Sequence, residues 1–392
     1  MNNQDLMARF QAAMVMNYGK MPAVIVRGKG SQLWDADGKE YIDLFAGFGG
    51  TILGHCHPAL VDAVTMQAQA LWAVGNQFYS EPQIRVAEHL KSKGFDGRAF
   101  FCHSGAESNE AAIKLARLAG GEGRFKIISM HKGFHGRTLG ALSATPTVEY
   151  QKDFLPMTPG FAHVPFNDVK ALEAAIDAQT CGVIVEPIQG EGGLNVPEEG
   201  YLKGVREICD RHKLTLIFDE VWTGCGRTGK YFAHQHFGVT PDIMTLGKAI
   251  GGGVPVGCMF ATPEKAALLK PGMHGCTLGG NPLCAAVAAA VFDVLDKDQL
   301  PAKATKLGEM AKTRIRGFKN AGSRIKDVRG HGLFIGVELT ATDGTPVVMA
   351  ALAKGLIVNA TSKNVLRICP ALTIEEQQLM RGLDILEQAI AA

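Results

Sequence analysis

The sequence of 392 residues has no long apolar run. A membrane-spanning helix needs about 18–20 apolar residues, whereas the most apolar stretch, residues 284–291, is soon interrupted by Asp293 and Asp296. The first residues also lack the basic segment and apolar core of a secretory signal. We therefore expect a cytoplasmic protein that does not bind membranes.

An excess of charge of one sign is also missing. Forty Lys and Arg residues face 38 Asp and Glu residues, giving a formal net charge of +2. The two signs are interspersed, so the sequence has none of the basic stripes that mark a nucleic-acid-binding surface. We expect its partners to be small molecules or other protein chains, and no nucleic acid.

Cysteine is present in an odd number, nine, scattered without a C-x-x-C pair. This usage is typical of a reduced cytosolic protein with mostly buried thiols. In His55-Cys56-His57, adjacent residues of an extended segment would point to opposite faces, so only the two histidines could converge on a metal ion. Real zinc sites have a far more specific spacing, and we expect no metal here.

Glycine, in contrast, is abundant, with 47 residues, above the usual usage of about 7%. Many glycines and a hydrophobic content of 46% suit a large α/β protein with tight loops near a ligand, and the length allows about two or three domains. Short apolar runs alternate with amphipathic stretches, which predicts repeated βα units. The expected strands are 99–102, 126–129, 182–185, 215–218 and 243–246, and the expected helices are 107–118, 169–178 and 202–212.

The domain pattern changes after Pro282. Residues 50–280 are predicted to form a large domain around a mainly parallel sheet. Residues 281–392 begin with a long Ala-rich helix and are predicted to form a smaller domain. Its strands are expected at 324–328, 333–339 and 365–368.

The most informative residues are an acid and a lysine at the ends of two apolar runs. Residues 214–218 end in Asp219, and residues 243–246 end in Gly247-Lys248. Ligands of doubly wound sheets bind beyond the carboxyl ends of the strands, so the two side chains are expected to face one ligand. A carboxylate for a pyridinium nitrogen and a lysine for an aldehyde are what pyridoxal 5'-phosphate (PLP) requires. A surface lysine and a helix-capping aspartate are the alternative for this pair alone.

A phosphate site is predicted at Ser104-Gly105-Ala106-Glu107. Serine followed three residues later by glutamate is a capping box, which predicts a helix start. A helix start offers free N–H groups and a positive dipole end, and Gly105 allows a phosphate to approach closely. On this motif alone, an ordinary helix cap is the favoured interpretation, because such boxes are common.

Four longer motifs follow one another along the chain. They are Val183-Ile184-Val185-Glu186-Pro187-Ile188-Gln189-Gly190-Glu191-Gly192-Gly193, Asp219-Glu220-Val221-Trp222-Thr223-Gly224, Gly226-Arg227-Thr228-Gly229-Lys230 and Pro241-Asp242-Ile243-Met244-Thr245-Leu246-Gly247-Lys248-Ala249. Together they resemble the class III aminotransferases, which are PLP enzymes of fold type I acting on terminal amines, and most of all the acetylornithine and ornithine enzymes. The resemblance extends from about residue 27 to residue 370. It implies a large PLP domain and a small domain that includes residues 1–49.

The resemblance also assigns residues to the cofactor. Lys248 bonds covalently to the PLP aldehyde and later moves a proton, while Asp219 keeps the ring nitrogen protonated. The phosphate is held by Ser104, Gly105 and Ala106, and Phe134 stacks on the ring within the motif Gly133-Phe134-His135-Gly136-Arg137-Thr138. His135, Glu186 and Trp222 are expected close to the cofactor. Thr277 matches a threonine that reaches the phosphate of a neighbouring subunit, which implies a homodimer with shared active sites.

On the substrate side, the resemblance implies an ω-amine donor and 2-oxoglutarate as acceptor. Arg367 matches the arginine that binds a substrate carboxylate, and Glu191 matches the glutamate that pairs with it when the amine substrate is present. Tyr18 and Arg137 are candidates for a distal carboxylate of the donor, and Phe48 for the pocket wall.

Three residues depart from the family pattern: Trp222 replaces glutamine, Phe48 stands at a variable wall position, and Thr51 replaces asparagine. The indole N–H of Trp222 is expected either to bond the phenolic oxygen of the cofactor or to point elsewhere in a packing role. We expect an ω-aminotransferase of the acetylornithine type. The alternatives are an ornithine, 4-aminobutyrate or other ω-amine transaminase, an aminomutase, or a PLP-binding protein without turnover.

Overall fold

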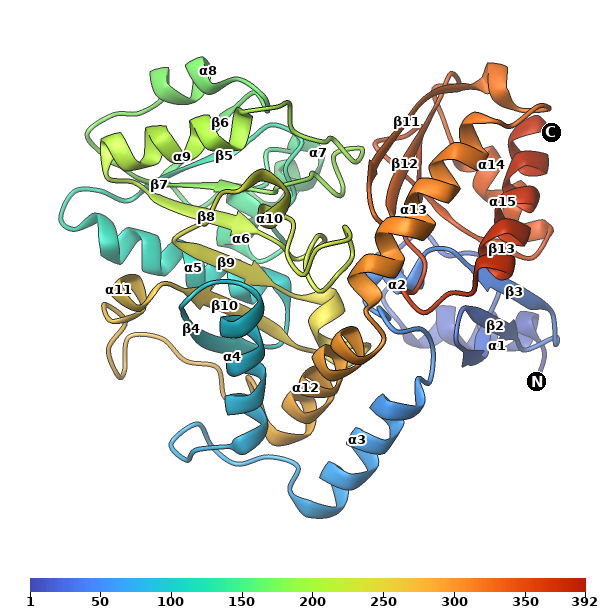
Figure 1. Ribbon diagram of the computed structural model, residues 1–392, viewed down its shortest axis with the longest axis horizontal. Helices are drawn as coiled ribbons and strands as arrows, with labels where there is room; N and C mark the ends of the chain where they lie inside the picture. Colours follow the sequence, from blue (N-terminus) through green and yellow to red (C-terminus); the bar gives the residue numbers. More distant parts are fainter.

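The computed structural model describes residues 1–392 and has a large and a small domain (Figure 1). A seven-stranded sheet in the order β4-β10-β9-β8-β7-β5-β6 forms the centre of the large domain. Its strands are β4 (Arg98–Cys102), β5 (Lys126–Met130), β6 (Phe161–Val164), β7 (Thr180–Val185), β8 (Thr215–Asp219), β9 (Ile243–Leu246) and β10 (Gly257–Ala261). Strands β5 to β9 are parallel, whereas β10 runs antiparallel to both of its neighbours. The sheet is therefore mainly parallel, as predicted.

Helices cover both faces of this sheet because its central strands are apolar on both sides. Every residue of β7, β8 and β9 is buried. Leu216 and Phe218 pack in the core with α9 (Tyr201–His212), while Ile217 between them packs in the core with α5 (Gly105–Gly120). Successive side chains of a strand point to opposite faces, so a continuous apolar run serves two helix layers.

The remaining helices of the large domain lie around these layers (Figure 1). They are α3 (Pro58–Ala70), α4 (Glu81–Lys93), α6 (Leu139–Ser143), α7 (Val148–Gln151), α8 (Val169–Ala174), α10 (His234–Phe237), α11 (Pro263–Ala266) and α12 (Pro282–Lys297), with the 3₁₀ helices η1 (Lys152–Phe154) and η2 (Lys248–Gly251). The Ala-rich helix expected after Pro282 is α12, which packs against α3 and α4. None of the helices of the protein is long and apolar enough to cross a membrane.

The small domain combines both ends of the chain (Figure 1). One sheet, in the order β1-β2-β3-β13, contains β1 (Ile25–Lys29), β2 (Gln32–Asp35), β3 (Glu40–Asp43) and β13 (Leu356–Ile357). The other, in the order β11-β12-β15-β14, contains β11 (Ile325–His331), β12 (Phe334–Leu339), β15 (Val365–Ile368) and β14 (Asn359–Thr361). Its helices are α1 (Asn3–Ala13), α2 (Ala46–Gly49), α13 (Leu300–Arg316), α14 (Thr345–Ala353) and α15 (Glu376–Ala391), with the 3₁₀ helix η3 (Gly322–Arg324).

The pairing of β3 with β13 explains how the N-terminal segment joins the small domain. Ile42 and Asp43 pair in parallel with Leu356 and Ile357, so a strand near each end of the chain contributes to one sheet. The turn after β3 then carries Phe45 and Phe48 towards the boundary with the large domain, where β15 also ends.

Candidate active site

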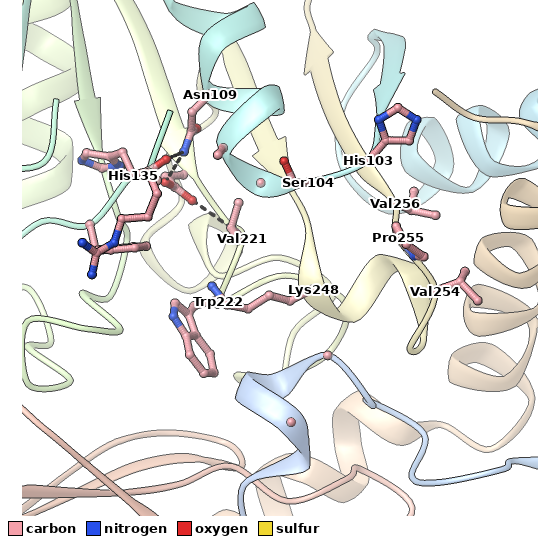
Figure 2. A pocket seen from close by; sticks show the side chains of 18 of the residues that line it. His103, Ser104, Asn109, His135, Val221, Trp222, Lys248, Val254, Pro255 and Val256 are labelled. Carbon is pink, nitrogen blue, oxygen red and sulfur yellow. Dashed lines mark hydrogen bonds and ion pairs between the residues drawn. The ribbon is translucent and has the colours of Figure 1, made fainter. Parts of the chain in front are cut away.

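The acid and the lysine singled out from the sequence lie at the same edge of the large sheet. Asp219 is the last residue of β8, and it pairs in register with Thr245 of the neighbouring parallel strand β9. Lys248 follows β9 by two residues and opens η2 with a positive φ of 46°. Both residues line one pocket of about 460 Å³ (Figure 2), which is within the size range of cofactor sites.

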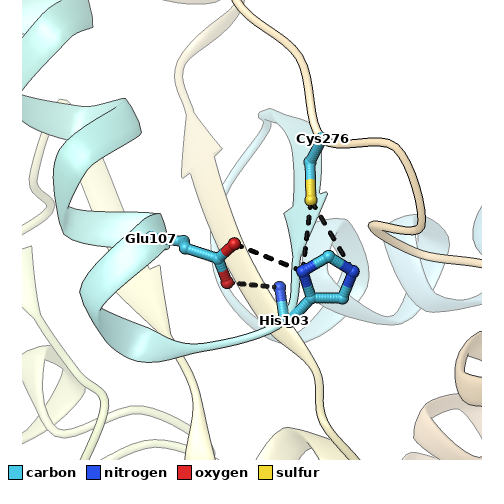
Figure 3. A group of neighbouring side chains, drawn as sticks. All are labelled: His103, Glu107 and Cys276. Carbon is cyan, nitrogen blue, oxygen red and sulfur yellow. Dashed lines mark hydrogen bonds and ion pairs between the residues drawn. The ribbon is translucent and has the colours of Figure 1, made fainter. Parts of the chain in front are cut away.

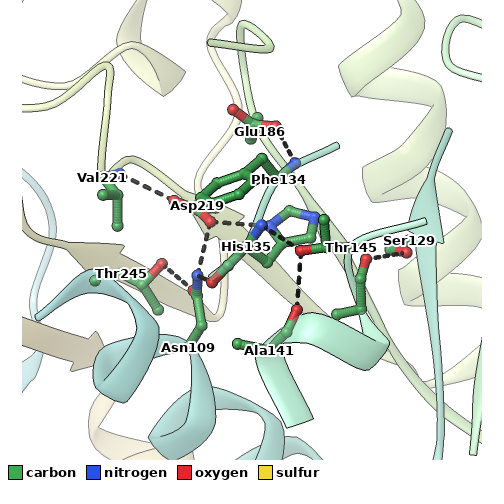
Figure 4. Close-up of polar contacts among 12 residues, drawn as sticks. Asn109, Ser129, Phe134, His135, Ala141, Thr145, Glu186, Asp219, Val221 and Thr245 are labelled. Carbon is green, nitrogen blue, oxygen red and sulfur yellow. Dashed lines mark hydrogen bonds and ion pairs between the residues drawn. The ribbon is translucent and has the colours of Figure 1, made fainter. Parts of the chain in front are cut away.

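Asp219 is held by three donors around its buried carboxylate (Figure 4). The side-chain amide of Asn109 donates to Oδ2 over 2.8 Å, and the backbone N–H of Val221 donates to Oδ1 over 3.0 Å. His135 Nδ1 lies 2.9 Å from Oδ2, which fits a tautomer with its proton on Nδ1. The carboxylate is thus fixed in one orientation by charge-assisted hydrogen bonds.

Asn109 was not identified from the sequence. Its amide also donates to the backbone oxygen of His135 over 2.6 Å, and its own oxygen accepts from Thr245 Oγ1 over 2.7 Å. Asn109 follows Gly105 by one turn of α5, so it lies on the same face as the phosphate-binding end of the helix. A polar residue on the apolar face of this helix was the available signal.

The N-terminus of α5 forms the part of the pocket predicted to hold phosphate. Ser104 is the N-cap, and its Oγ accepts from the N–H of Glu107 over 3.2 Å. Ser104, Gly105 and Ala106 all line the pocket. A side chain at Gly105 would meet Val221, and one at Gly247 would meet the backbone of Gly105. The two glycines therefore let the loop before Lys248 contact the phosphate end of the pocket.

Glu186 is buried beside this network and accepts two backbone hydrogen bonds. Phe134 N–H donates to Oε1 over 2.9 Å, and Gly190 N–H donates to Oε2 over 2.8 Å. Burial raises the pKa of Glu186 to about 7; Asp219 raises it further, and His135 opposes the increase. Glu186 thus positions Phe134, whose ring lines the pocket, and the loop that leads to Glu191.

The amine of Lys248 is tuned by burial. Removal from water lowers its pKa from 10.5 to about 8, with Glu191 and Asp219 opposing the decrease and Arg367 adding to it. A larger share of this amine is therefore neutral near pH 7 than for an exposed lysine. Neutral lysine is the form that attacks a carbonyl carbon.

Arg367 and Glu191 form an ion pair next to this amine. Arg367 lies on β15 of the small domain, and its NH1 donates to Glu191 Oε1 over 2.9 Å and to the backbone oxygen of Gly190 over 3.1 Å. Burial opposes ionisation of Glu191, but the charges of Arg367 and Lys248 outweigh it and lower the pKa of Glu191. The NH2 group of Arg367 is buried without a partner, which leaves a charged donor for a ligand.

Trp222 fits between two glycines. A side chain at Gly49 or at Gly190 would collide with the indole ring, so these glycines accommodate its bulk. Lys248 Nζ lies 4.3 Å, and the Arg367 guanidinium carbon 4.1 Å, from the ring centroid. Both distances are those of cation–π contacts.

The N–H of Trp222 has a definite partner in this arrangement. The indole nitrogen donates to Glu191 Oε1 over 3.2 Å, the same oxygen that accepts from Arg367. The indole N–H is therefore directed onto the Glu191–Arg367 ion pair.

The other predicted residues are distributed unevenly. Arg137 lines the pocket, and its guanidinium carbon stacks 3.6 Å from the ring centroid of Tyr150, a residue that sequence reasoning missed. Phe48 lies at the aromatic contact with Arg367, 5.9 Å from the guanidinium carbon to the ring centroid. Tyr18 and Thr277 are exposed, and neither lines the pocket of its own chain.

The residues present fit PLP. A helix N-terminus suits a phosphate, a fixed carboxylate suits a pyridinium nitrogen, and an amine of lowered pKa suits an aldehyde, and all three line one pocket. The chain also matches the model of the family Aminotransferase class-III over residues 13–390.

The chain belongs to the class III aminotransferases. An acetylornithine aminotransferase of Methanocaldococcus jannaschii is 46% identical, with 95% of this chain and 94% of the relative covered. The acetylornithine aminotransferase of Caldanaerobacter subterraneus is 44% identical, over 95% and 96%. Among solved structures, the ornithine aminotransferase of Toxoplasma gondii superposes with a TM-score of 0.95 at 34% identity, covering 100% of this chain and 95% of that one. These findings confirm the fold, which is fold type I of the PLP-dependent enzymes, and the class of enzyme, a transaminase.

Proposed function

We propose that this aminotransferase uses PLP to move the terminal amino group of an acetylornithine-like donor to 2-oxoglutarate, giving a semialdehyde and glutamate. The names of relatives at 43–46% identity over nearly the full length support the donor. A structure of the Toxoplasma enzyme described with partial PLP occupancy supports the cofactor.

The observation that carries the proposal is the Glu191–Arg367 pair beside Lys248. An acceptor with two carboxylates needs a cation, whereas the extended chain of an amine donor needs that cation neutralised. Arg367 meets the first need through its unpaired NH2 group, and Glu191 meets the second through its contact of 2.9 Å with NH1. A pair that opens and closes lets one pocket accept both substrates in turn.

The residues then divide the work as follows. Ser104, Gly105 and Ala106 would hold the phosphate, Phe134 would cover the ring, and Asp219 would keep the ring nitrogen protonated. PLP, when bound, supplies the electron sink for the carbanion formed at the substrate carbon. Lys248, as a neutral amine, would take a proton from the substrate carbon and hold it on Nζ for later transfer. Asn109 and His135 hold Asp219 in place throughout.

Arg137 is the candidate for the distal carboxylate of the donor. It lines the pocket with its guanidinium stacked on Tyr150, so its orientation is restricted while its N–H groups stay available. Tyr18, the other candidate from the sequence, is exposed, and we assign the donor carboxylate to Arg137 alone.

We also propose a homodimer in which Thr277 reaches the site of the partner subunit. Thr277 is exposed beside Leu278, and the segment containing Trp72, Phe78 and Tyr79 exposes three large aromatic rings. Exposed aromatic rings of this kind are suited to a protein–protein interface. A cytoplasmic location, supported by nine unpaired cysteines, completes the proposal.

A donor screen tests the proposed reaction. Acetylornithine, ornithine and 4-aminobutyrate are each supplied with 2-oxoglutarate, and glutamate formation is measured. We expect the highest kcat/KM with acetylornithine. A higher value with either other amine would replace the donor, and turnover without 2-oxoglutarate would favour an aminomutase. PLP binding without turnover of any of these amines would favour a non-catalytic protein.

A further inference from the structure

A second cluster of reactive side chains adjoins the pocket, and one of its members, His103, also lines that pocket. His103 precedes the N-cap of α5, Glu107 is in the first turn of that helix, and Cys276 lies on the distant loop before α12 (Figure 3). One ligand atom from each of the three lies within 4.8 Å of the other two. All three residues are partly buried, so solvent can enter the cluster.

Two of the three separations between these atoms are close to those of a tetrahedral metal site, and the third is within 4.8 Å. His103 Nδ1 lies 3.2 Å from Glu107 Oε1 and 3.4 Å from Cys276 Sγ. Zinc binds nitrogen and oxygen at about 2.0–2.1 Å and sulfur at about 2.3 Å, which separates neighbouring ligand atoms of a tetrahedron by roughly 3.3–3.6 Å. The two distances centred on Nδ1 therefore need little change to accept an ion.

The ligands are also held in place by contacts that leave these atoms free. Glu107 Oε2 accepts from the N–H of His103 over 2.9 Å and from Ser104 Oγ over 3.0 Å, so Oε1 is the oxygen turned to the cluster. On the other side, the Asn76 amide donates to the backbone oxygens of Cys276 and Gly279. A side chain at Gly279 would collide with the backbone of β4, so the loop lies flat against that strand.

We propose that His103 Nδ1, Glu107 Oε1 and Cys276 Sγ bind a Zn²⁺-like ion, with water as the fourth ligand. Thiolate, imidazole and one carboxylate form a borderline-soft set that favours Zn²⁺ over Mg²⁺ or Ca²⁺. The thiol must lose its proton to solvent as the zinc–sulfur bond forms, and the imidazole binds through its neutral form.

An ion at this position joins two parts of the molecule that flank the cofactor. His103 and Glu107 adjoin Ser104 at the phosphate end of the pocket, and Cys276 adjoins Thr277. In the homodimer, which rests on the proposed function, Thr277 would reach the partner's phosphate. The ion would then tie both phosphate sites to one loop and restrict motion of the N-terminus of α5.

Zinc binding to the chelator-treated holoenzyme tests the site. ZnCl₂ is titrated in competition with a chromophoric chelator, in the absence of substrates. We expect one ion per chain, with a Kd about 100-fold or more higher in Cys276→Ser and in His103→Asn, since even outer partners of a ligand change affinity 10- to 100-fold. Cys284→Ser is the matched control, because that partly exposed cysteine lies outside the cluster and its loss should leave the Kd unchanged.

Two further readouts keep the result independent of activity. Co²⁺ bound to wild type should show long-wavelength visible bands of a tetrahedral thiolate site, which Cys276→Ser lacks. Zn²⁺ should raise the Tm of wild type and of Cys284→Ser but not of Cys276→Ser. Binding that persists in both cluster variants, or no binding at all to wild type, overturns the proposal. Either result leaves the donor screen, which needs no metal, unaffected.

Discussion

The part of the candidate site proposed for the cofactor (the cofactor half) and the part proposed for the substrates (the substrate half) are built in different ways. In the cofactor half, Asp219 ends a strand of the large-domain sheet, and Lys248 and Ser104 follow other strands of the same sheet. In the substrate half, Glu191 comes from a large-domain loop, whereas Arg367 comes from β15 of the small domain. The first half is assembled within one folded unit, and the second exists only when two units meet.

The two halves also differ in how completely their polar groups are hydrogen bonded. The Asp219 carboxylate has a partner on each oxygen, but Arg367 keeps one buried N–H group without a partner. An unpaired charged donor is costly unless a ligand satisfies it. We infer that the cofactor half is fixed before any ligand binds, and that the substrate half changes its contacts between the two substrates.

The largest effect should come from Lys248→Ala, which removes the covalent link and the proton carrier together. Loss of a positioned acid–base group costs about 10²–10⁴-fold in rate, so turnover should become almost undetectable. The visible absorbance of the lysine-bound cofactor should also disappear under conditions where wild type shows it. Retention of both the band and the activity would mean that another lysine has this role.

The pH dependence of PLP capture by the apoenzyme tests the lowered pKa of Lys248. The neutral amine increases as pH rises through the pKa of about 8, so capture by the apoenzyme should rise roughly tenfold per pH unit below pH 8 and then level off. Capture by a free lysine derivative at the same pH values corrects for ionisation of PLP itself. A midpoint at the ordinary value of 10.5 would show that burial does not tune this amine.

Arg367→Ala should weaken 2-oxoglutarate binding by about 10- to 100-fold, because hydrogen bonds to a charged group contribute about 1.5–3 kcal/mol. Single-turnover kinetics of the acceptor half-reaction measure this effect apart from the donor. Arg367→Lys keeps the charge without the two-pronged geometry and should bind with intermediate affinity. Undiminished affinity in both variants, with wild-type Tm, would remove Arg367 from the site.

The sequence predicted that Asp219, Lys248 and Ser104 would lie together, and all three line one pocket. Asp219 and Lys248 could be placed because buried parallel strands appear as continuous apolar runs whose last residues must meet at one edge. Ser104 was marked by a capping box, a local pattern that the structure contains at the N-terminus of α5. Strand β10 was missed because Gly257–Ala261 runs antiparallel to both of its neighbours and follows β9 without an intervening amphipathic α-helix.

The substrate half was less predictable because its contacts join residues far apart in the chain. The resemblance paired Glu191 with Arg367, but no local pattern indicates that Trp222 would donate to Glu191. Space for the indole depends on Gly49 and Gly190, which belong to different loops. Tyr150 likewise meets Arg137 through tertiary packing alone.

Asn109→Ala should have a smaller effect, on the fixed half. It removes the amide that donates to Asp219 over 2.8 Å, a charge-assisted bond worth about 1.5–3 kcal/mol. Because Val221 and His135 still hold the carboxylate, we expect PLP affinity to fall by about tenfold. Thr245→Val removes the hydroxyl that orients the Asn109 amide and should change affinity in the same direction by less. Equal PLP affinity in wild type and Asn109→Ala would exclude a positioning role.

The smallest expected effect, and the one that best separates the two halves, is that of Trp222→Phe. The variant keeps a ring against Arg367 and Lys248 but loses the N–H that donates to Glu191. In wild type that N–H stabilises the closed Glu191–Arg367 pair, which the acceptor must open. A hydrogen bond of about 1 kcal/mol net corresponds to roughly fivefold, so 2-oxoglutarate should bind about fivefold more tightly while the donor binds more weakly.

If Trp222 acts by donating a hydrogen bond to Glu191, the affinities for the two substrates change in opposite directions in Trp222→Phe. If Trp222 only fills space between Gly49 and Gly190, the variant should have a lower Tm and should bind both substrates more weakly. Trp34→Phe, which changes the tryptophan stacked on Arg27 in the small domain, controls for a general effect of losing an indole. The visible spectrum of the bound cofactor should stay unchanged in Trp222→Phe, because the indole N–H donates to the ion pair. A shift in the pH dependence of that spectrum would instead mean that the indole donates to the phenolic oxygen of PLP, which would place Trp222 in the cofactor half of the site.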